Sequence, residues 1–152
     1  MHKFRGVSNL SLDAKGRIVL PARYRDRLLE TCDSQLIITI DTEQPCLLIY
    51  PLNEWEIIEE KIESLPSFNP VTRRIQRLLI GHATDVEVDS NGRMLLSTPL
   101  REYAQLGKKV VLIGQGKKFE LWDETIWGQR MDEWLANKTD DDMPEALAEL
   151  TL

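Results

Sequence analysis

One eight-residue pattern occurs twice in the chain. Residues 13–20 and 89–96 both read D-x-x-G-R followed by three apolar residues. A proline, an arginine, two apolar runs and a tryptophan then follow in the same order in both copies. The offset between the copies is 76 residues at Asp13 and Asp89 and 72 at Trp55 and Trp127. Self-similarity of this kind indicates repeated structural units. We therefore expect two copies of strand–turn–strand–helix–strand–strand–helix.

The repeated pattern has the chemistry of a tight turn. An aspartate side chain can accept hydrogen bonds from the backbone of its own turn, and glycine can adopt positive φ. The apolar residues on either side predict a hairpin or a tight connection between strands. We expect a turn or structural role for Asp13, Gly16, Asp89, Gly92 and Arg93.

Helix boundaries are predicted from capping residues, prolines and glycines. Pro21 and Pro99 are expected in first helical turns, with Thr98 as a cap and Gly107 as a stop in the second copy. Asn53 is expected to cap one helix together with Glu56, and Asn69 to cap another before Pro70, with a stop near Gly81. Asp123 is expected to cap a last helix that ends near Asn137. Residues 139–144 should be loose, because their charges cannot be buried, and residues 146–152 should form one helical turn.

Composition excludes several classes of protein. The 152 residues suffice for one domain, and no apolar run approaches the roughly 18 residues of a membrane helix. The N-terminus lacks the apolar segment of a signal peptide. Two cysteines in such a chain are expected to be reduced, and the two histidines show no metal-ligand spacing. We expect a cytoplasmic protein with no metal and no cofactor.

The charge of −6 is distributed unevenly along the chain. Residues 1–27 hold seven basic and two acidic residues, a net +5, and residues 71–131 are net +3. Residues 28–70 are net −8, and residues 132–152 are net −6. A basic end of this kind is typical of a polyanion-binding surface. The alternative is that oppositely charged segments attract each other or a neighbouring subunit.

No motif in the chain points to catalysis. The G-x-S-x-G, Walker and zinc signatures are all absent from the sequence. His82 follows Gly81 and fits helix capping or packing better than a general base. Asp13 and Asp89 could be imagined as paired carboxylates, but glycine-containing turns favour turn bonding. We expect no enzyme and no small-molecule substrate.

Several separated motifs, in order, resemble the MraZ family of bacterial transcriptional regulators. The motifs are Phe4–Gly6, Leu12–Arg17, Pro45–Pro51, Asn69-Pro70 with Arg73-Arg74, Leu78–Ala83 and Lys118–Asp123. The resemblance covers residues 4 to about 135. It implies an α/β (α+β) fold, in which two pseudo-twofold SpoVT-AbrB repeats form one compact β-rich unit with flanking helices. The expected boundaries are 7–54 for the first, DNA-binding repeat, 55–82 for inter-repeat helices, 83–126 for the second repeat, and 127–152 for a C-terminal helix and acidic tail.

The resemblance also implies a function. A protein of this family is expected to bind G-rich direct repeats of double-stranded DNA in its own promoter, as a ring-shaped homo-oligomer. It would regulate the division and cell-wall gene cluster and associate with the nucleoid. The alternatives are a structural ring and an RNA-binding ring. RNA is disfavoured because few aromatic residues lie near the basic segments.

Four residues are the candidate DNA contacts. Arg17 is the first, because arginine reads guanine through a two-pronged hydrogen bond in the major groove. Its alternative role is an ion pair with Asp13. Lys15 lies at the turn tip, where it could meet phosphate or remain solvated. Arg25 falls where AbrB-like relatives carry a DNA-contacting arginine, and Arg5 lies in the matched opening motif.

The second copy is expected to be mainly structural. The residue equivalent to Lys15 is Asn91, so the local positive charge is lower, although Arg93 and Arg101 are kept. Between the copies, Arg73, Arg74 and Arg77 share one polar helix face. We interpret that face as solvated or as a surface for a neighbouring subunit.

Overall fold

The computed structural model describes residues 3–137 and 144–150. The first copy contains β1 (Phe4–Ser11), β2 (Arg17–Val19), α1 (Ala22–Cys32), β3 (Gln35–Ile40), β4 (Leu47–Pro51) and α2 (Leu52–Glu63). The second contains β5 (Thr84–Glu87), β6 (Arg93–Leu95), α4 (Thr98–Tyr103), β7 (Lys109–Gly116), β8 (Phe119–Asp123) and α5 (Glu124–Ala136). Between the copies lie α3 (Pro70–Ile75) and a π-helical segment, η1 (Gln76–Ile80), and α6 (Glu145–Ala148) follows α5. The predicted order of elements is confirmed in both copies.

The two copies share one sheet. Its six strands run in the order β1-β7-β8-β4-β3-β5, and all pairs are antiparallel. The first strand of each copy therefore pairs with a strand of the other copy, β1 with β7 and β5 with β3. This exchange makes one mixed α+β unit with pseudo-twofold symmetry, as the fold class predicted.

A second, two-stranded sheet joins the copies at the repeated pattern. Strand β2 pairs with β6 in antiparallel register, with Arg17 opposite Leu95 and Val19 opposite Arg93. We call this two-stranded sheet of β2 and β6 the ribbon. Two further backbone bonds extend it, because Leu96 N–H donates to Gly16 O and Leu20 N–H donates to Gly92 O. Each D-x-x-G-R segment is a tight turn closed by hairpin-type backbone bonds, from Gly16 N–H to Asp13 O and from Asp13 N–H to Arg17 O in the first copy. The strands on either side of the turn belong to different sheets, so the turn also connects one sheet to the other.

The main core lies between the six-stranded sheet and α1, α4 and the ribbon. In it the rings of Phe4, Tyr24 and Phe119 pack together in edge-to-face and tilted arrangements, with ring centroids 4.4 to 6.0 Å apart. Ile18 and Met94 project into this core from the inner face of the ribbon. Because burial of such side chains is worth about 1.5–3 kcal/mol each, the ribbon is fixed to the body of the molecule by its inner face.

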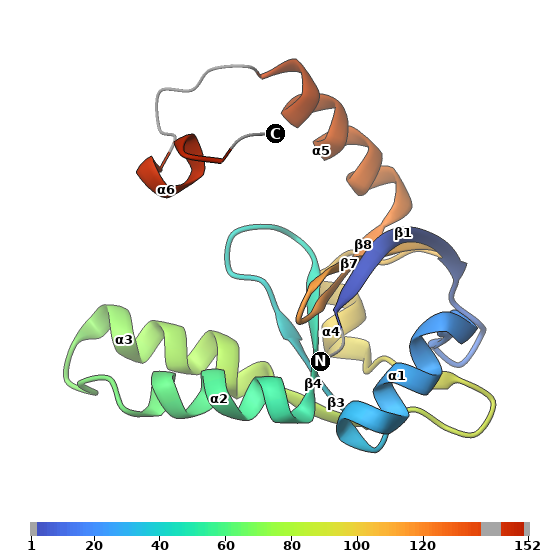
Figure 1. The fold of residues 1–152 in the computed structure, drawn as a ribbon, viewed down its shortest axis with the longest axis horizontal. Helices are drawn as coiled ribbons and strands as arrows, with labels where there is room; N and C mark the ends of the chain where they lie inside the picture. Colours follow the sequence, from blue (N-terminus) through green and yellow to red (C-terminus); the bar gives the residue numbers. More distant parts are fainter. Residues whose placement is uncertain (1–2, 138–143, 151–152) are drawn as a thin grey trace.

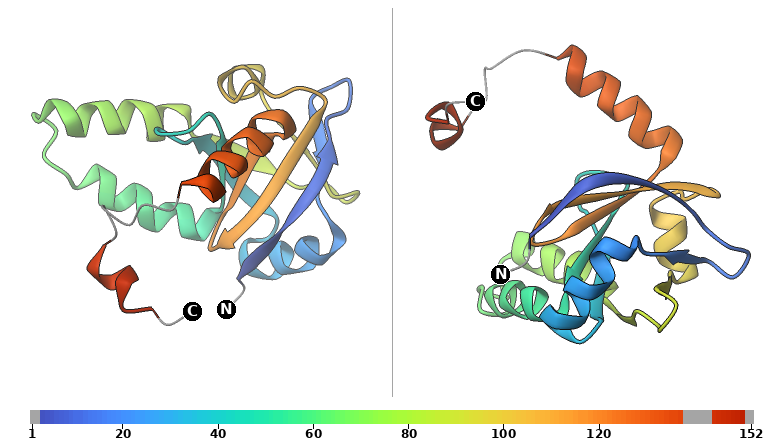
Figure 2. Two further views of the ribbon diagram at one scale, coloured as in Figure 1. Left: turned by 90° about the horizontal axis from the view of Figure 1, so that it is seen from above. Right: turned by 45° about the vertical axis from the view of Figure 1, so that its right-hand side comes forward.

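Two helical parts project from the body. Helices α2 and α3 lie side by side as a hairpin on one flank, and α5 leaves the sheet in a different direction (Figure 1). The views in Figure 2 show that the hairpin and α5 remain separate when the molecule is turned. Phe68, between α2 and α3, is 88% exposed. No helix in the described ranges is long and apolar enough to cross a membrane.

Two predicted caps are confirmed and three predicted helix boundaries are wrong. Asn69 caps α3 and Asp123 caps α5, which ends at Ala136. Helix α2 begins at Leu52, and α4 has Ser97 as its N-cap, so neither Asn53 nor Thr98 is the cap. Positive φ falls at Gln105, so Gly107 does not end α4.

The residues that precede α2 and α4 are Pro51 and Ser97, two residues and one residue before the predicted caps Asn53 and Thr98. Tight strand-to-helix connections begin these helices without a side-chain cap. Pro99 lies in the first turn of α4 as expected, whereas Pro21 is the residue just before α1. The predicted stop near Gly81 is one residue early, because the chain remains helical through His82.

Two further expectations concern the cysteines and the tail. Cys32 and Cys46 are both free thiols. The expected C-terminal helical turn is present as α6. The expectation that residues 139–144 are loose falls mostly outside the described residues.

Candidate nucleic-acid interface

Each D-x-x-G-R turn is organised by its aspartate. One carboxylate oxygen of Asp13 accepts hydrogen bonds from the backbone N–H groups of Lys15 and Arg17, both at 2.9 Å. The other carboxylate oxygen accepts from Arg17 Nε at 2.8 Å. The backbone bond from Arg17 is the main reason that the pKa of Asp13 falls from 3.8 to about 2. The carboxylate is therefore ionised at neutral pH and fixes the start of β2.

The turn of the second copy has the same bonds. Asp89 accepts from the N–H groups of Asn91 and Arg93 at 2.9 Å, and from Arg93 Nε at 3.1 Å. The backbone bond from Arg93 is again the main cause that lowers the pKa of Asp89. Gly16 and Gly92 have φ values of +83° and +77°, so positive φ occurs at the predicted positions.

Arg17 is held by one edge of its guanidinium group. The Nε atom is bonded to Asp13, and among the described residues its two terminal nitrogens have no hydrogen-bond partner. The side chain is 29% exposed and that of Asp13 is 40% exposed. An ion pair at this exposure adds little stability. What the pair does is orient the guanidinium group, and the two terminal NH2 groups remain available as a fork of donors.

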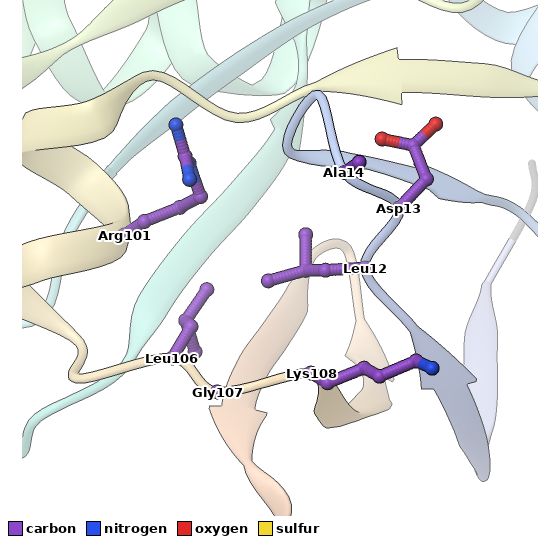
Figure 3. Close-up of a pocket in the computed structure, with 7 residues that line it drawn as sticks. All are labelled: Leu12, Asp13, Ala14, Arg101, Leu106, Gly107 and Lys108. Atoms are coloured by element: carbon purple, nitrogen blue, oxygen red, sulfur yellow. The ribbon is translucent and has the colours of Figure 1, made fainter.

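Each turn is also supported by an arginine from the other copy. Arg101 lies on the Gly16 turn, where a Cβ atom on Gly16 would come within 2.8 Å of its Nε and Cζ atoms. It is held there by Leu96 O and by the hydroxyl of Thr98. Figure 3 shows Arg101 beside the Leu12–Ala14 segment, across a cavity of about 510 Å³ that Lys108 also lines.

Arg25 has the equivalent position on the second turn. Its Nε donates to Leu20 O at 2.8 Å, and its side chain packs directly on Gly92. The structure therefore brings Arg17, Lys15 and Arg101 together at one turn and Arg93, Asn91 and Arg25 at the other. Sequence reasoning made Arg25 a candidate DNA contact beside Arg17 because it falls where AbrB-like relatives carry a DNA-contacting arginine. The exchange between copies could not be found from the order of residues.

Arg5 lies apart from both Arg17 and Lys15. It is exposed near the start of β1, and Ser11 lies six positions further along the extended strand, a distance of about 20 Å at 3.3 Å per residue. The structure thus places Arg5 at the end of β1 opposite to the turn. The nearby arginines of α1 are used structurally, because Arg23 bonds Ser8 and Arg27 bonds the backbone of Lys3.

The exposed face of the ribbon joins both copies in one surface. Arg17 and Val19 on β2, and Arg93 and Leu95 on β6, alternate with the buried Ile18 and Met94. Opposite residues of an antiparallel pair project to the same face, so these four side chains are neighbours. Sequence reasoning missed the two aliphatic residues. The signal was present, because Arg17 and Val19 are two positions apart on either side of a core residue.

One group of potential metal ligands occurs away from the ribbon. Among the described residues, ligand atoms of Asp41, Cys46 and Glu120 lie within 4.8 Å of one another. These groups already make hydrogen bonds within the fold, because Cys46 Sγ donates to Asp41 and Glu120 accepts from the indole of Trp122. Burial raises the pKa of the Cys46 thiol, so it is protonated and is a poor ligand.

Comparison with known proteins agrees with the two-copy architecture. The family model described as "MraZ protein, putative antitoxin-like" matches the chain twice, at residues 3–78 and 79–147. A protein of Alkalilimnicola ehrlichii is 54% identical over 149 residues, which is 98% of this chain and 99% of that protein. One of Thioalkalivibrio sulfidiphilus is 55% identical, with 96% and 97% covered, and one of Coxiella burnetii is 54% identical, with 98% and 99% covered. All three are named "Transcriptional regulator MraZ". This chain therefore belongs to the MraZ family.

Proposed function

We propose that the chain is a DNA-binding transcriptional regulator that reads G-rich promoter repeats as a ring-shaped homo-oligomer. The observation that carries the proposal is Arg17, whose guanidinium group is oriented by Asp13 and leaves a fork of donors exposed at the edge of a two-stranded ribbon. The names of its relatives support the same class of function. The proposal contains no catalytic step.

The ribbon suits the major groove of DNA. A two-stranded antiparallel ribbon fits the groove, and the paired donors of arginine match O6 and N7 of guanine. Lys15 is exposed at the tip of the same turn and is suited to a phosphate or a base edge. We propose that Arg17 and Lys15 make the main contacts, and that the first repeat, residues 7–54, is the DNA-binding one.

Arg25 and Arg5 have smaller roles in the proposal. Arg25 is half-buried and one of its donors is bonded to Leu20 O, so we propose that it supports the second turn and adds positive charge beside it. Arg5 is about 20 Å from the turn along β1, so it would attract the flanking DNA backbone rather than read the same base pair.

A ring would add the affinity that a single turn lacks. Specific protein–DNA interfaces bury roughly 1,000 Å² or more of protein surface, which exceeds one turn. Several identical turns on one oligomer bind repeated sites with avidity, and subunits related by rotation match direct repeats in DNA. Association with chromosomal DNA would place the protein at the nucleoid.

The helical hairpin is the surface that we propose for ring contacts. Helix α2 exposes the acidic residues Glu56, Glu60 and Glu63, and the next helical segments expose Arg73, Arg74 and Arg77. Surfaces of opposite sign on one chain are complementary to those of a second copy. Exposed Phe68, Leu65 and Val71 at the hairpin tip would supply the apolar part of the contact.

Replacing Arg17 tests the DNA site. We expect Arg17→Ala to abolish specific binding of a duplex from the region upstream of the chain's own gene, because each bidentate guanine contact is worth about 1–3 kcal/mol and is lost in every subunit. Gel shift measures binding and light scattering measures the mass of the particle, which should be an unchanged multimer. Arg130→Ala is the matched control, because Arg130 lies on α5, outside both the ribbon and the proposed ring contacts. Retained promoter affinity in Arg17→Ala would exclude this site.

The alternative is a ring that binds RNA or has a purely structural role. Comparing the promoter duplex, a scrambled duplex and RNA of the same length at one salt concentration separates the three possibilities, because backbone binding depends strongly on salt. Equal affinity for both duplexes would contradict sequence-specific regulation, and preference for RNA would favour the alternative.

A further inference from the structure

We propose that Val19 and Leu95 are specificity residues that contact the C5-methyl groups of thymines next to the guanines read by the ribbon. The inference rests on the proposed function, since it assigns the remaining side chains of the same surface. It adds a second base to the sequence that the surface selects.

The two aliphatic residues lie at exposed positions of the two ribbon strands. Val19 is 47% exposed and Leu95 is 54% exposed, although both alternate with core residues in short strands. They occupy equivalent positions in the two copies, two residues after each repeated arginine. An apolar side chain on the solvent face of a basic ribbon gains free energy only when a partner covers it.

The register of the ribbon places each aliphatic residue beside an arginine. Leu95 is directly opposite Arg17, and Val19 is directly opposite Arg93. Cβ atoms of such cross-strand pairs are about 4.5–5.5 Å apart. Adjacent base pairs of B-DNA are separated by about 3.4 Å along each strand. When the arginine meets a guanine edge, its cross-strand partner therefore faces the neighbouring base pair.

Thymine is the base that offers an apolar group at this place. The C5-methyl group lies in the major groove, where it distinguishes thymine from every other base through apolar contact. Arg17 and Arg93 carry charge complementary to DNA on the same face, which favours a duplex over an apolar protein surface as the occupant.

Uracil-substituted DNA tests the proposal directly, because uracil lacks only the methyl group of thymine. The probe is the duplex from the region upstream of the chain's own gene, amplified with either dTTP or dUTP. We expect the wild-type full chain to bind the uracil duplex about three- to tenfold more weakly, as expected for one or two methyl groups left uncovered. In the Val19→Ala/Leu95→Ala variant the thymine-to-uracil ratio should fall close to one.

A control variant separates the methyl contact from general effects. Val7 is a valine of β1 that is 55% exposed and lies outside the ribbon, so Val7→Ala should keep the wild-type ratio. Uracil also changes the shape of the duplex, and this effect does not depend on the two side chains. It is therefore the same for the wild type and the double variant, and it cancels when their thymine-to-uracil ratios are compared.

Three outcomes would overturn the inference. An equal thymine-to-uracil ratio in the wild type and the double variant would show that the two residues do not sense the methyl group. A smaller particle formed by the double variant would assign this face to subunit contact. Failure of the wild type to prefer its thymine duplex over a scrambled thymine duplex would contradict the proposed function. This outcome is distinguishable from failure of the methyl contact, because it is measured without uracil.

Discussion

Asp13 shows how one side chain can serve both the fold and the site. Its carboxylate accepts two backbone donors and one side-chain donor, and the same three bonds recur at Asp89. The turn bonding of these residues was predictable, because aspartate and glycine have well-known local preferences. The partners of Arg25 and Arg101 were not, because each packs on a glycine that is distant in sequence.

The pKa of Asp13 gives a prediction at the residue scale. Because about 2 is below the ordinary 3.8, the ionised carboxylate stabilises the folded state above about pH 4, and this contribution is lost as the pH falls through about 2. Carbon-detected NMR titration should measure the depressed value. In Arg17→Ala the pKa should remain below 3.8, because the backbone N–H of residue 17 is its main cause and survives the substitution.

A return of the Asp13 pKa to its ordinary value in Arg17→Ala would contradict this account. It would mean that the guanidinium group holds the turn, and that loss of DNA binding in the variant could follow from loss of the turn. Titration of Asp89 in the same samples is the internal control, since its own arginine is unchanged.

At the scale of elements, each turn is clasped by the helix of the other copy. Helix α1 brings Arg25 onto Gly92, and α4 brings Arg101 onto Gly16. The elements themselves were predictable from hydrophobic pattern, proline and glycine. The caps Asn69 and Asp123 were predictable, because a free helix end needs a hydrogen-bond acceptor. The predictions of Asn53 and Thr98 as caps were wrong, because a tight strand connection sets where each of those helices begins.

We call the contact of Arg25 with Gly92, and of Arg101 with Gly16, the clasp. Glycine substitutions distinguish its contribution to stability from that of backbone strain. Gly92→Ala and Gly116→Ala both force alanine into positive φ, at a cost of roughly 1–2 kcal/mol. A Cβ at residue 116 meets no atom within 4 Å, whereas one at residue 92 overlaps Arg25. We expect Gly92→Ala to lower the free energy of unfolding more than Gly116→Ala, measured by urea denaturation at one protein concentration.

Removal of the clasping arginine provides the test of cause. In an Arg25→Ala background, Gly92→Ala should cost no more than Gly116→Ala does, because the overlapping side chain is gone. Equal losses for the two glycine variants in the wild-type background would argue against a clasp. The same pair of comparisons can be made with Gly16 and Arg101.

At the scale of the whole molecule, exchanged strands make the two copies mutually dependent. Strand β1 pairs along all eight residues with β7, and β5 pairs only with β3. Sequence analysis predicted two copies in one unit, which the shared sheet confirms. It could not assign strand partners, because pairing between distant segments depends on packing that no local pattern records.

This dependence predicts a single unfolding transition. Trp55 is buried beside Tyr50 of the first copy, and Trp122 is buried against α5 of the second. Tryptophan fluorescence and far-ultraviolet circular dichroism of the unchanged chain should give the same urea midpoint, since neither copy has a complete sheet alone. Two separate midpoints would show that the copies unfold independently.

The pairing of β1 with β7 has a consequence for synthesis on the ribosome. The first strand to emerge cannot find its partner until residues 109–116 are made, roughly 5–20 s later at about 5–20 residues per second. An unpaired strand is exposed to aggregation during that delay. β1 is an edge strand and is mostly exposed, and its polar residues Arg5, Ser8, Asn9 and Ser11 reduce the aggregation hazard of the strand before it pairs.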